Sequence, residues 1–226
     1  ESALIGNNVF ASVTGIDISP VRIEAARELH AGVSDRLCFV VGDVNDGKLG
    51  SQTYDIVFAK AALHHVENIE QLASGICQSL RPNGLLVAID FFGPTRFQWT
   101  DAQIAAANWF LSNRIPQALR TRADGSVYEE VRRPTVEEMI ALDPSEAVRS
   151  SELLHVLSER FDIQVDIHLG GTLLNLIFYG DIINNFDVQD QTHNHILREA
   201  FQYERALLND GTLSSDFRLI MAKPRS

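Results

Sequence analysis

Cysteine, positive charge and long hydrophobic runs are all scarce in this chain, and each shortage excludes a class of protein. Two cysteines among 226 residues provide no disulfide framework, so Cys38 and Cys77 are interpreted as small buried side chains of a strand and a helix. Lys and Arg number 19 against 30 Asp and Glu, a formal net charge of −11. That balance argues against a nucleic-acid partner. Without a membrane-span or secretion-signal pattern, a cytoplasmic protein is expected.

One local group of positive charges departs from this acidic average. It lies in a polar stretch of the second half and consists of Arg120, Arg122, Arg132 and Arg133. We interpret it as a solvated or substrate-contacting loop rather than a nucleic-acid surface.

Two short apolar runs each lead into an acid. Residues 11–16 precede Asp17, and residues 39–42 precede Asp43, with a helical segment between the two runs. Apolar runs of this length are typical of strands buried on both faces of a parallel sheet. Ligands of open α/β sheets bind at the carboxyl ends of such strands. The pair of acids therefore predicts a nucleotide-like cofactor site, with one carboxylate for ribose hydroxyls and the other for a base edge.

Strand and helix patterns alternate through the first half of the chain. Ser19 and Pro20 are typical of a helix start, and Pro82 and Gly84 interrupt the pattern after another helix. The expected strands are 9–18, 36–41, 54–59 and 85–91, and the expected helices are 20–30 and 68–80, after a helix tail at 1–7. This order predicts an α/β fold with a Rossmann-like, doubly wound, mostly parallel sheet.

The second half breaks this alternation. Helices are expected at 101–119, 135–141, 150–160 and 193–208, with strands at 161–168 and 217–222. An apolar stretch at 173–186 is interpreted as a core helix, with a pocket for a hydrophobic ligand as the alternative. We therefore expect one domain, divided into a core at 1–94, a helical cap insertion at 95–150, and C-terminal helices and closing strands at 151–226.

Five short motifs in order suggest a family. They are Ile16–Pro20, Gly42–Val44, Tyr54–Val57, Leu63–Val66 and Leu80–Leu85. Together they resemble the class I S-adenosylmethionine-dependent methyltransferases, most strongly over residues 9–92. The resemblance implies S-adenosylmethionine as cofactor and an antiparallel C-terminal strand. The family's first strand and Gly-rich loop, expected just before the helix ending near Asn7, have no counterpart here, so the sheet is expected to lack its central strand.

The resemblance also implies which residues hold the cofactor. Asp17 would bind the ribose hydroxyls, Asp43 the adenine edge, and the backbone N–H of Val44 the ring. The remaining members are Ile18 on the adenine face, Gly42 in the same motif, and Lys60, whose side chain must point away from a sulfonium. Asp17 and Asp43 have a simpler interpretation as a helix cap and a turn acid.

Two adjacent histidines, His64 and His65, are expected beside the transferred methyl group. Either is a candidate proton acceptor, because a hydroxyl acceptor needs a base that titrates near neutral pH. Quinone-biosynthesis relatives bind a metal with acids near this segment, where this chain has Ala61 and His64, so no metal is expected. The His193 and His195 pair is interpreted as helix surface.

The acceptor is expected to bind to the cap, and a sugar or small-molecule hydroxyl in polysaccharide or secondary-metabolite biosynthesis is the first hypothesis. The candidate contacts are Tyr128, Arg132, Arg133, Glu146 and Arg149. For residues 143–149 the alternative is an ordinary helix start. Two rival functions remain open: a nicotinamide-dependent oxidoreductase, which also uses a strand-end acid, and a non-catalytic methyltransferase-like binding module.

Overall fold

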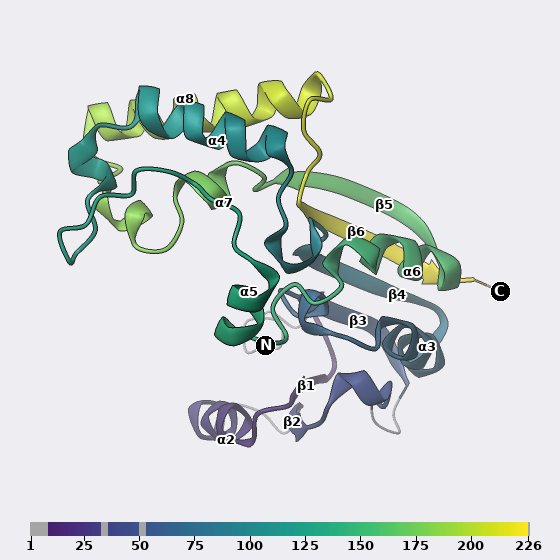
Figure 1. Cartoon of the computed structure of the whole chain (residues 1–226). Coiled ribbons are helices and arrows are strands. Elements are labelled where there is room, and N and C mark those ends of the chain that lie inside the picture. The colour runs from purple at the N-terminus through teal and green to yellow at the C-terminus, as the bar shows by residue number, and fades with distance from the viewer. Residues whose placement is uncertain (1–8, 33–35, 50–52, 226) are drawn as a thin grey trace.

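The computed structural model describes residues 9–32, 36–49 and 53–225, and the helix expected at 1–7 lies outside them. Strands and helices alternate through the first half as predicted (Figure 1). The strands are β1 (Val13–Asp17), β2 (Leu37–Val41), β3 (Tyr54–Lys60), β4 (Leu80–Phe91), β5 (Phe161–Gly170) and β6 (Phe217–Pro224). The helices are α2 (Pro20–Leu29), α3 (Ile69–Ser79), α4 (Asp101–Arg114), α5 (Val136–Leu142), α6 (Leu153–Arg160), α7 (Leu174–Ile177) and α8 (Gln191–Asn209).

The larger sheet has four strands in the order β3-β4-β6-β5. Strand β3 runs parallel to β4, with Lys60 opposite Ile89, whereas β6 runs antiparallel to both β4 and β5. Together with the parallel pair β1 and β2, this arrangement confirms the mostly parallel α/β fold with an antiparallel C-terminal strand.

Strands β1 and β2 form a separate two-stranded sheet, and no described strand joins it by hydrogen bonds to the four-stranded sheet. Helix α2 packs on this pair, burying Ile23 and Phe39, but Val40 and Val41 remain 41% and 45% exposed. The expectation of a doubly buried strand was therefore wrong for β2. Cys38 is likewise exposed and not a core side chain, because it lies on an open strand.

Two hydrophobic clusters stabilise the rest of the fold. The first lies between the four-stranded sheet and helices α3 and α6, and includes Leu72, Leu86, Leu157 and Ile220. The second joins α4, α7 and α8, which lie together beyond the end of β4 (Figure 1). The apolar stretch at 173–186 contributes to this second cluster as core, burying Leu173, Leu176 and Ile177.

Local sequence signals fix several helix ends. Ser19 caps α2 by accepting a hydrogen bond from the backbone N–H of Arg22, with Pro20 at the first helical position. Thr100 and Gln103 form a capping box at the start of α4. This helix ends at Arg114, earlier than the predicted residue 119, because Pro116 follows and a 3-10 turn at Gln117–Arg120 replaces the last turn. Among the described residues, no helix is both long and apolar enough to cross a membrane.

Candidate active site

A buried imidazole–carboxylate pair lies at the carboxyl ends of β3 and β4. His64 belongs to a 3-10 turn at Leu63–His65 just after β3, and Asp90 is the next-to-last residue of β4. Nδ1 of His64 lies 2.6 Å from Oδ1 of Asp90, and the Asp90 residue is 1% exposed. Oδ2 of Asp90 also accepts the backbone N–H groups of Ala62 and Leu63, both at 2.8 Å. Asp90 thus fixes both the turn and the ring it carries.

The hydrogen bond to Asp90 determines which nitrogen of His64 is reactive. An ionised carboxylate only accepts, so the neutral imidazole carries its hydrogen on Nδ1 and presents Nε2 as the acceptor. Nε2 points away from the sheet, toward the segment after α5. The pair therefore has the composition and orientation of a general base with its orienting acid.

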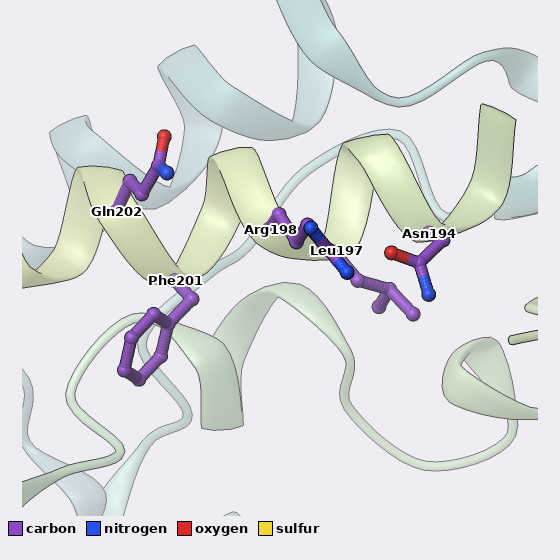
Figure 2. Close-up of a pocket in the computed structure, with 5 residues that line it drawn as sticks. All are labelled: Asn194, Leu197, Arg198, Phe201 and Gln202. Carbon is purple, nitrogen blue, oxygen red and sulfur yellow. The ribbon is translucent and has the colours of Figure 1, made fainter. Parts of the chain in front are cut away.

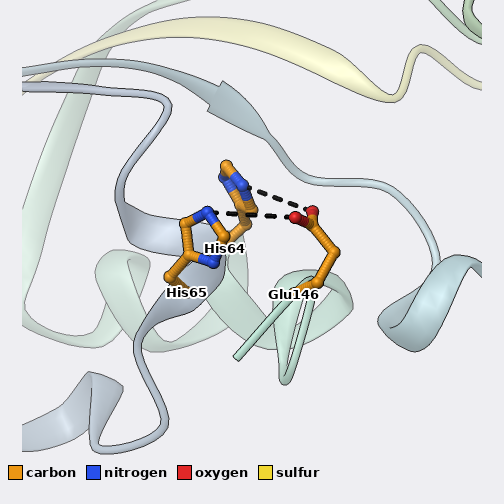
Figure 3. A group of neighbouring side chains, drawn as sticks. All are labelled: His64, His65 and Glu146. Carbon is orange, nitrogen blue, oxygen red and sulfur yellow. Dashed lines mark ion pairs between the residues drawn. The ribbon is translucent and has the colours of Figure 1, made fainter. Parts of the chain in front are cut away.

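Glu146 comes from that segment, 82 residues after His64, and faces both histidines (Figure 3). Its Oε1 lies 3.5 Å from Nε2 of His64, and its Oε2 lies 3.9 Å from Nε2 of His65. A backbone hydrogen bond of 3.1 Å, from the N–H of Val148 to the carbonyl of His64, holds the two segments together.

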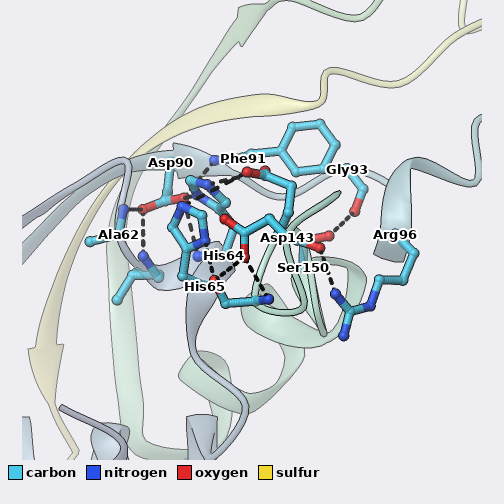
Figure 4. Close-up of polar contacts among 12 residues, drawn as sticks. Ala62, His64, His65, Asp90, Phe91, Gly93, Arg96, Asp143 and Ser150 are labelled. Carbon is cyan, nitrogen blue, oxygen red and sulfur yellow. Dashed lines mark hydrogen bonds and ion pairs between the residues drawn. The ribbon is translucent and has the colours of Figure 1, made fainter. Parts of the chain in front are cut away.

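A second set of contacts orients His65 (Figure 4). Nδ1 of His65 lies 3.1 Å from the hydroxyl of Ser145, and that hydroxyl donates to Asp143 at 2.7 Å. Asp143 also accepts the backbone N–H of Ser145 at 2.8 Å. His65 is the more open of the two rings, with 37% of its side chain exposed against 11% for His64.

Backbone strain is concentrated around this group of side chains. Four non-glycine residues with positive φ border it: Ala61 (48°), Arg96 (53°), Phe97 (51°) and Ala147 (47°). Arg96 donates its backbone N–H to the carbonyl of Ala147 at 2.8 Å, and its guanidinium donates to the carbonyl of Glu146 at 3.1 Å. Such conformations cost about 1–3 kcal/mol each and cluster at functional sites.

Electrostatics favour the charged form of His64. Burial alone lowers the pKa of the His64 ring, but the hydrogen bond to Asp90 and the charges of Asp90, Glu146 and Asp143 outweigh it and raise that pKa. For Asp90, burial opposes ionisation, yet the hydrogen bonds from His64 and the backbone of Ala62 hold its pKa below the usual range. His64 therefore accepts a proton readily.

The two strand-end acids lie where the sequence predicted, at neighbouring parallel strands. The carbonyl of Asp17 accepts the N–H of Gly42 at 3.0 Å, joining the ends of β1 and β2. Asp17 also accepts the N–H of Ser19 at 2.7 Å. Oδ1 of Asp43 accepts two hydrogen bonds from Asn45. Both carboxylates are partly exposed, so each remains accessible to a ligand.

Comparison with known proteins finds methyltransferases that are similar to the first part of the chain. Residues 2–88 match the family model described as a methyltransferase domain. The chain is 36% identical over 81 residues to the mitochondrial ubiquinone biosynthesis O-methyltransferase of Schizosaccharomyces pombe, an alignment covering 34% of this chain and 29% of the relative. It is 35% identical over 81 residues to the 27-O-demethylrifamycin SV methyltransferase of Amycolatopsis mediterranei, covering 35% and 30%. Over about its first 88 residues, the chain is thus similar to methyltransferases.

The matched segments are a small part of these relatives. They span less than a third of the two enzymes and 2% of a hybrid PKS-NRPS synthetase of Xenoacremonium sinensis, which is 32% identical over 82 residues and 34% of this chain.

Solved structures extend the likeness of fold to nearly the whole chain. An S-adenosylmethionine-dependent methyltransferase from Mesorhizobium loti gives a TM-score of 0.51 at 17% identity, covering 95% of this chain and 81% of that one. The [4+2]-cyclase SpnF also gives 0.51, at 14% identity, covering 98% and 70%. At these identities the likeness concerns the fold alone, since one fold can support different reactions.

Of the predicted acceptor contacts, the structure brings Glu146 to the histidines. The other four make contacts elsewhere. Tyr128 donates its hydroxyl to the carbonyl of Leu176, Arg132 pairs with Glu138, and Arg133 pairs with Asp101. Arg149 binds Glu70 and Glu152. Their role in acceptor binding stays a prediction.

The remaining predicted residues lie on open surface or at strand ends. Ile18 is 64% exposed beside Asp17, Lys60 is exposed at the end of β3, and Gly42 and Val44 flank Asp43. His193 accepts the backbone N–H of Asp187, and His195 lies 3.8 Å from Glu199 on the same helix.

A hollow on the outer face of α8 contains none of the predicted site residues (Figure 2). Five residues of this single helix line it: Asn194, Leu197, Arg198, Phe201 and Gln202. It offers no group with perturbed chemistry, and we assign it no ligand.

One group of metal-ligating side chains occurs in the described part of the chain, formed by His64, His65 and Glu146, whose ligand atoms lie within 4.8 Å of one another. Pairing of the Glu146 carboxylate with the two rings accounts for this proximity. The expected absence of a metal stays a prediction.

Sequence reasoning missed Asp90. The signal was present, because Asp90 follows the apolar residues 85–89 near the end of β4, much as Asp17 and Asp43 follow their own runs. A rule applied to every strand end would have selected all three acids.

Proposed function

We propose that the protein transfers the methyl group of S-adenosylmethionine to the hydroxyl of a small-molecule or sugar acceptor, in polysaccharide or secondary-metabolite biosynthesis. The observation that carries the proposal is the buried His64–Asp90 pair at the ends of β3 and β4. A base of this kind serves an acceptor that must lose a proton, such as an alcohol. The names of two relatives, a ubiquinone biosynthesis O-methyltransferase and a demethylrifamycin methyltransferase, are consistent with such an acceptor.

The cofactor would bind at the ends of β1 and β2. Asp17 would bind the ribose hydroxyls and Asp43 the adenine edge. The hydrogen-bonded pairing of their strands supports this assignment. These partly exposed acceptors fit a nucleoside, which offers hydroxyl and amine donors. Bound S-adenosylmethionine would supply an electrophilic methyl group on a sulfonium, which is a good leaving group.

His64 would then take the acceptor's proton. As the hydroxyl oxygen forms its bond to the methyl carbon, the O–H proton moves to Nε2 of His64. The carbon–sulfur bond breaks and its electron pair stays on sulfur. Asp90 holds the ring in the required tautomer and stabilises the imidazolium.

Glu146 would contribute from the cap. Its carboxylate, 3.5 Å from Nε2 of His64, stabilises the ring once it is protonated. Asp90, Asp143 and Glu146 together make the site acidic, which favours neutral acceptors over anionic ones. We further propose a reducing, cytoplasmic location, consistent with two free cysteines, and no nucleic-acid partner, because the net charge is −11.

The family match favours methyl transfer over the nicotinamide-dependent alternative. An experiment distinguishes methyl transfer from the alternative of a non-catalytic binding module. Full-length protein is incubated with S-adenosylmethionine carrying a labelled methyl group and a panel of sugar, phenol and polyketide alcohols. Label in an alcohol is expected with the wild type and with His155→Ala, a control at an exposed histidine. It should fall by at least about 100-fold with His64→Ala. Cofactor binding without turnover on any alcohol would favour the binding module.

A further inference from the structure

The turn that follows Asp43 is tied to Asp43 by one side chain. In the 3-10 turn Val44–Asp46, Asn45 donates its backbone N–H and its Nδ2 to Oδ1 of Asp43, at 2.9 and 3.0 Å. Two donors on one carboxylate oxygen fix the orientation of that carboxylate.

The opposite end of the same side chain reaches the segment that carries the histidines. Oδ1 of Asn45 accepts the backbone N–H groups of Glu67 and Asn68, both at 3.0 Å. Asn68 is the residue directly before α3, so Asn45 ties its own turn to the start of that helix, 23 residues further along the chain. Because Asn45 meets an acceptor on one side and donors on the other, its amide has one satisfied orientation.

Close packing holds the turn in place. Gly75 on α3 lies so near Gly47 that a Cβ at Gly75 would overlap the carbonyl oxygen of Gly47. Gln71, also on α3, donates Nε2 to the carbonyl of Asp46 at 2.9 Å. The turn therefore moves with α3.

Arg149, from the segment expected to form the cap, binds the peptide group between Glu67 and Asn68. Arg149 donates to the carbonyl of Glu67 at 2.8 Å, while the N–H of Asn68, which belongs to the same peptide group, donates to Asn45. Glu67 lies two residues after His65, so the cofactor turn, the histidine turn and the cap meet at one backbone unit.

We propose that Asn45 is a positioning residue that orients Asp43 for the adenine edge and links its turn to the histidine segment. The proposal rests on the proposed function in one respect, the binding of adenosine by Asp43. The roles of Nδ2 and Oδ1 of Asn45 are separable. Asn45→Asp keeps an oxygen acceptor for Glu67 and Asn68, where a carboxylate before a helix is favourable, but loses the Nδ2 donor and sets a like charge beside Asp43.

The test uses S-adenosylhomocysteine as probe on the full-length protein. Titration calorimetry gives its Kd, steady-state kinetics give KM for S-adenosylmethionine and kcat, and urea gives the unfolding midpoint. For Asn45→Asp we expect Kd and KM to rise at least fivefold, with kcat and the unfolding midpoint close to wild type. Asn45→Ala, which loses both ends, should also lower the midpoint. Asn113→Asp, at an exposed asparagine whose Nδ2 bonds within α4, is the control and should change neither Kd nor KM.

Asp43→Asn separates the two proposals. If Asp43→Asn weakens binding while Asn45→Asp leaves Kd unchanged, the positioning role is overturned and the cofactor site stands. If Asp43→Asn itself leaves Kd unchanged, the proposed cofactor contact is overturned.

Discussion

His64 and Asp90 come from segments 26 residues apart, yet they form a buried hydrogen bond of 2.6 Å. Register places Lys60 of β3 opposite Ile89 of β4, so the chain that leaves β3 passes close to Asp90, the residue after Ile89. Parallel pairing thereby brings a base and its orienting acid together without a dedicated loop.

Asp90→Asn should lower kcat by at least about 100-fold, the range for loss of a positioned base. Both Asp90 oxygens accept hydrogen bonds, from the N–H groups of Ala62 and Leu63 and from Nδ1 of His64. An amide satisfies the two N–H groups with its oxygen and must then turn its NH₂ toward Nδ1. His64 is forced into the tautomer with hydrogen on Nε2, which cannot accept a proton.

Single-turnover kinetics with labelled cofactor would measure the loss from Asp90→Asn. The Kd for S-adenosylhomocysteine is the control, since the change lies away from Asp17 and Asp43. Unchanged turnover would remove Asp90 from the mechanism.

The rate should rise with pH, with a midpoint above the ordinary histidine value of about 6.5. His64 must be neutral to act as base, and its neighbouring carboxylates raise its pKa. Glu146→Gln removes one of these charges, so its midpoint should lie lower than that of the wild type. The kcat–pH profile of both proteins decides this, and identical midpoints would show that Glu146 does not act on His64.

The raised pKa of His64 makes stability and activity change with pH in opposite directions. A group whose folded pKa is raised stabilises the protein fully below its unfolded pKa, and that contribution is lost as the pH rises through the folded value. The contribution of His64 to stability is thus lost across the pH range in which its activity as a base appears.

The site's elements could be predicted from sequence where the signal is local. Asp17 and Asp43 end apolar strands, and the histidines follow the next strand, so all four were found by pattern. Glu146 was singled out only as an acceptor contact, since no local pattern brings a residue from the cap to His64. For Arg132 and Arg133, the polar loop predicted contacts with the acceptor. In the structure their guanidinium groups form ion pairs with Glu138 and Asp101 instead.

The wrong prediction of burial for β2 had a similar origin. The apolar run of β2 predicted burial on both faces, but burial depends on neighbouring elements that the run itself does not specify. Helix α2 packs on one face of the pair, and Phe39 is buried whereas Cys38 and Val40, which point to the opposite face, are exposed. Val41, at the end of the strand, is exposed as well.

Asp17→Ala should weaken binding of S-adenosylhomocysteine by at least tenfold, about 1.4 kcal/mol. The carboxylate is the proposed ribose acceptor, and it also accepts the N–H of Ser19 before α2. Asp17→Asn retains an acceptor for Ser19 and separates the two roles. Calorimetry on both variants, with Glu24→Ala on α2 as control, checks this. Affinity equal to wild type in both would exclude Asp17 from the site.

A chelator should leave turnover unchanged. The group formed by His64, His65 and Glu146 has the spacing of a metal set, but a base must keep Nε2 of His64 free. Activity is measured after dialysis against EDTA and again after addition of Mg²⁺, Mn²⁺ or Zn²⁺. Loss of activity with EDTA and recovery with one cation would reassign the group as a metal centre.

Asp216→Asn should stabilise the protein, and more at pH 8 than at pH 5. Asp216, before β6, is 4% exposed; burial raises its pKa to about 7, and the charge of Glu204 adds to this despite a hydrogen bond from Gln103. The folded state holds this proton where the unfolded state has lost it, so wild-type stability falls as pH rises from about 4 to about 7. Asparagine keeps an acceptor for Gln103 without the charge, and the extra gain at pH 8 should exceed about 1.4 kcal/mol. Urea unfolding at pH 5 and pH 8 measures the change in unfolding free energy, with the exposed Asp187→Asn as control. An equal change at the two pH values would show that Asp216 is ionised at both.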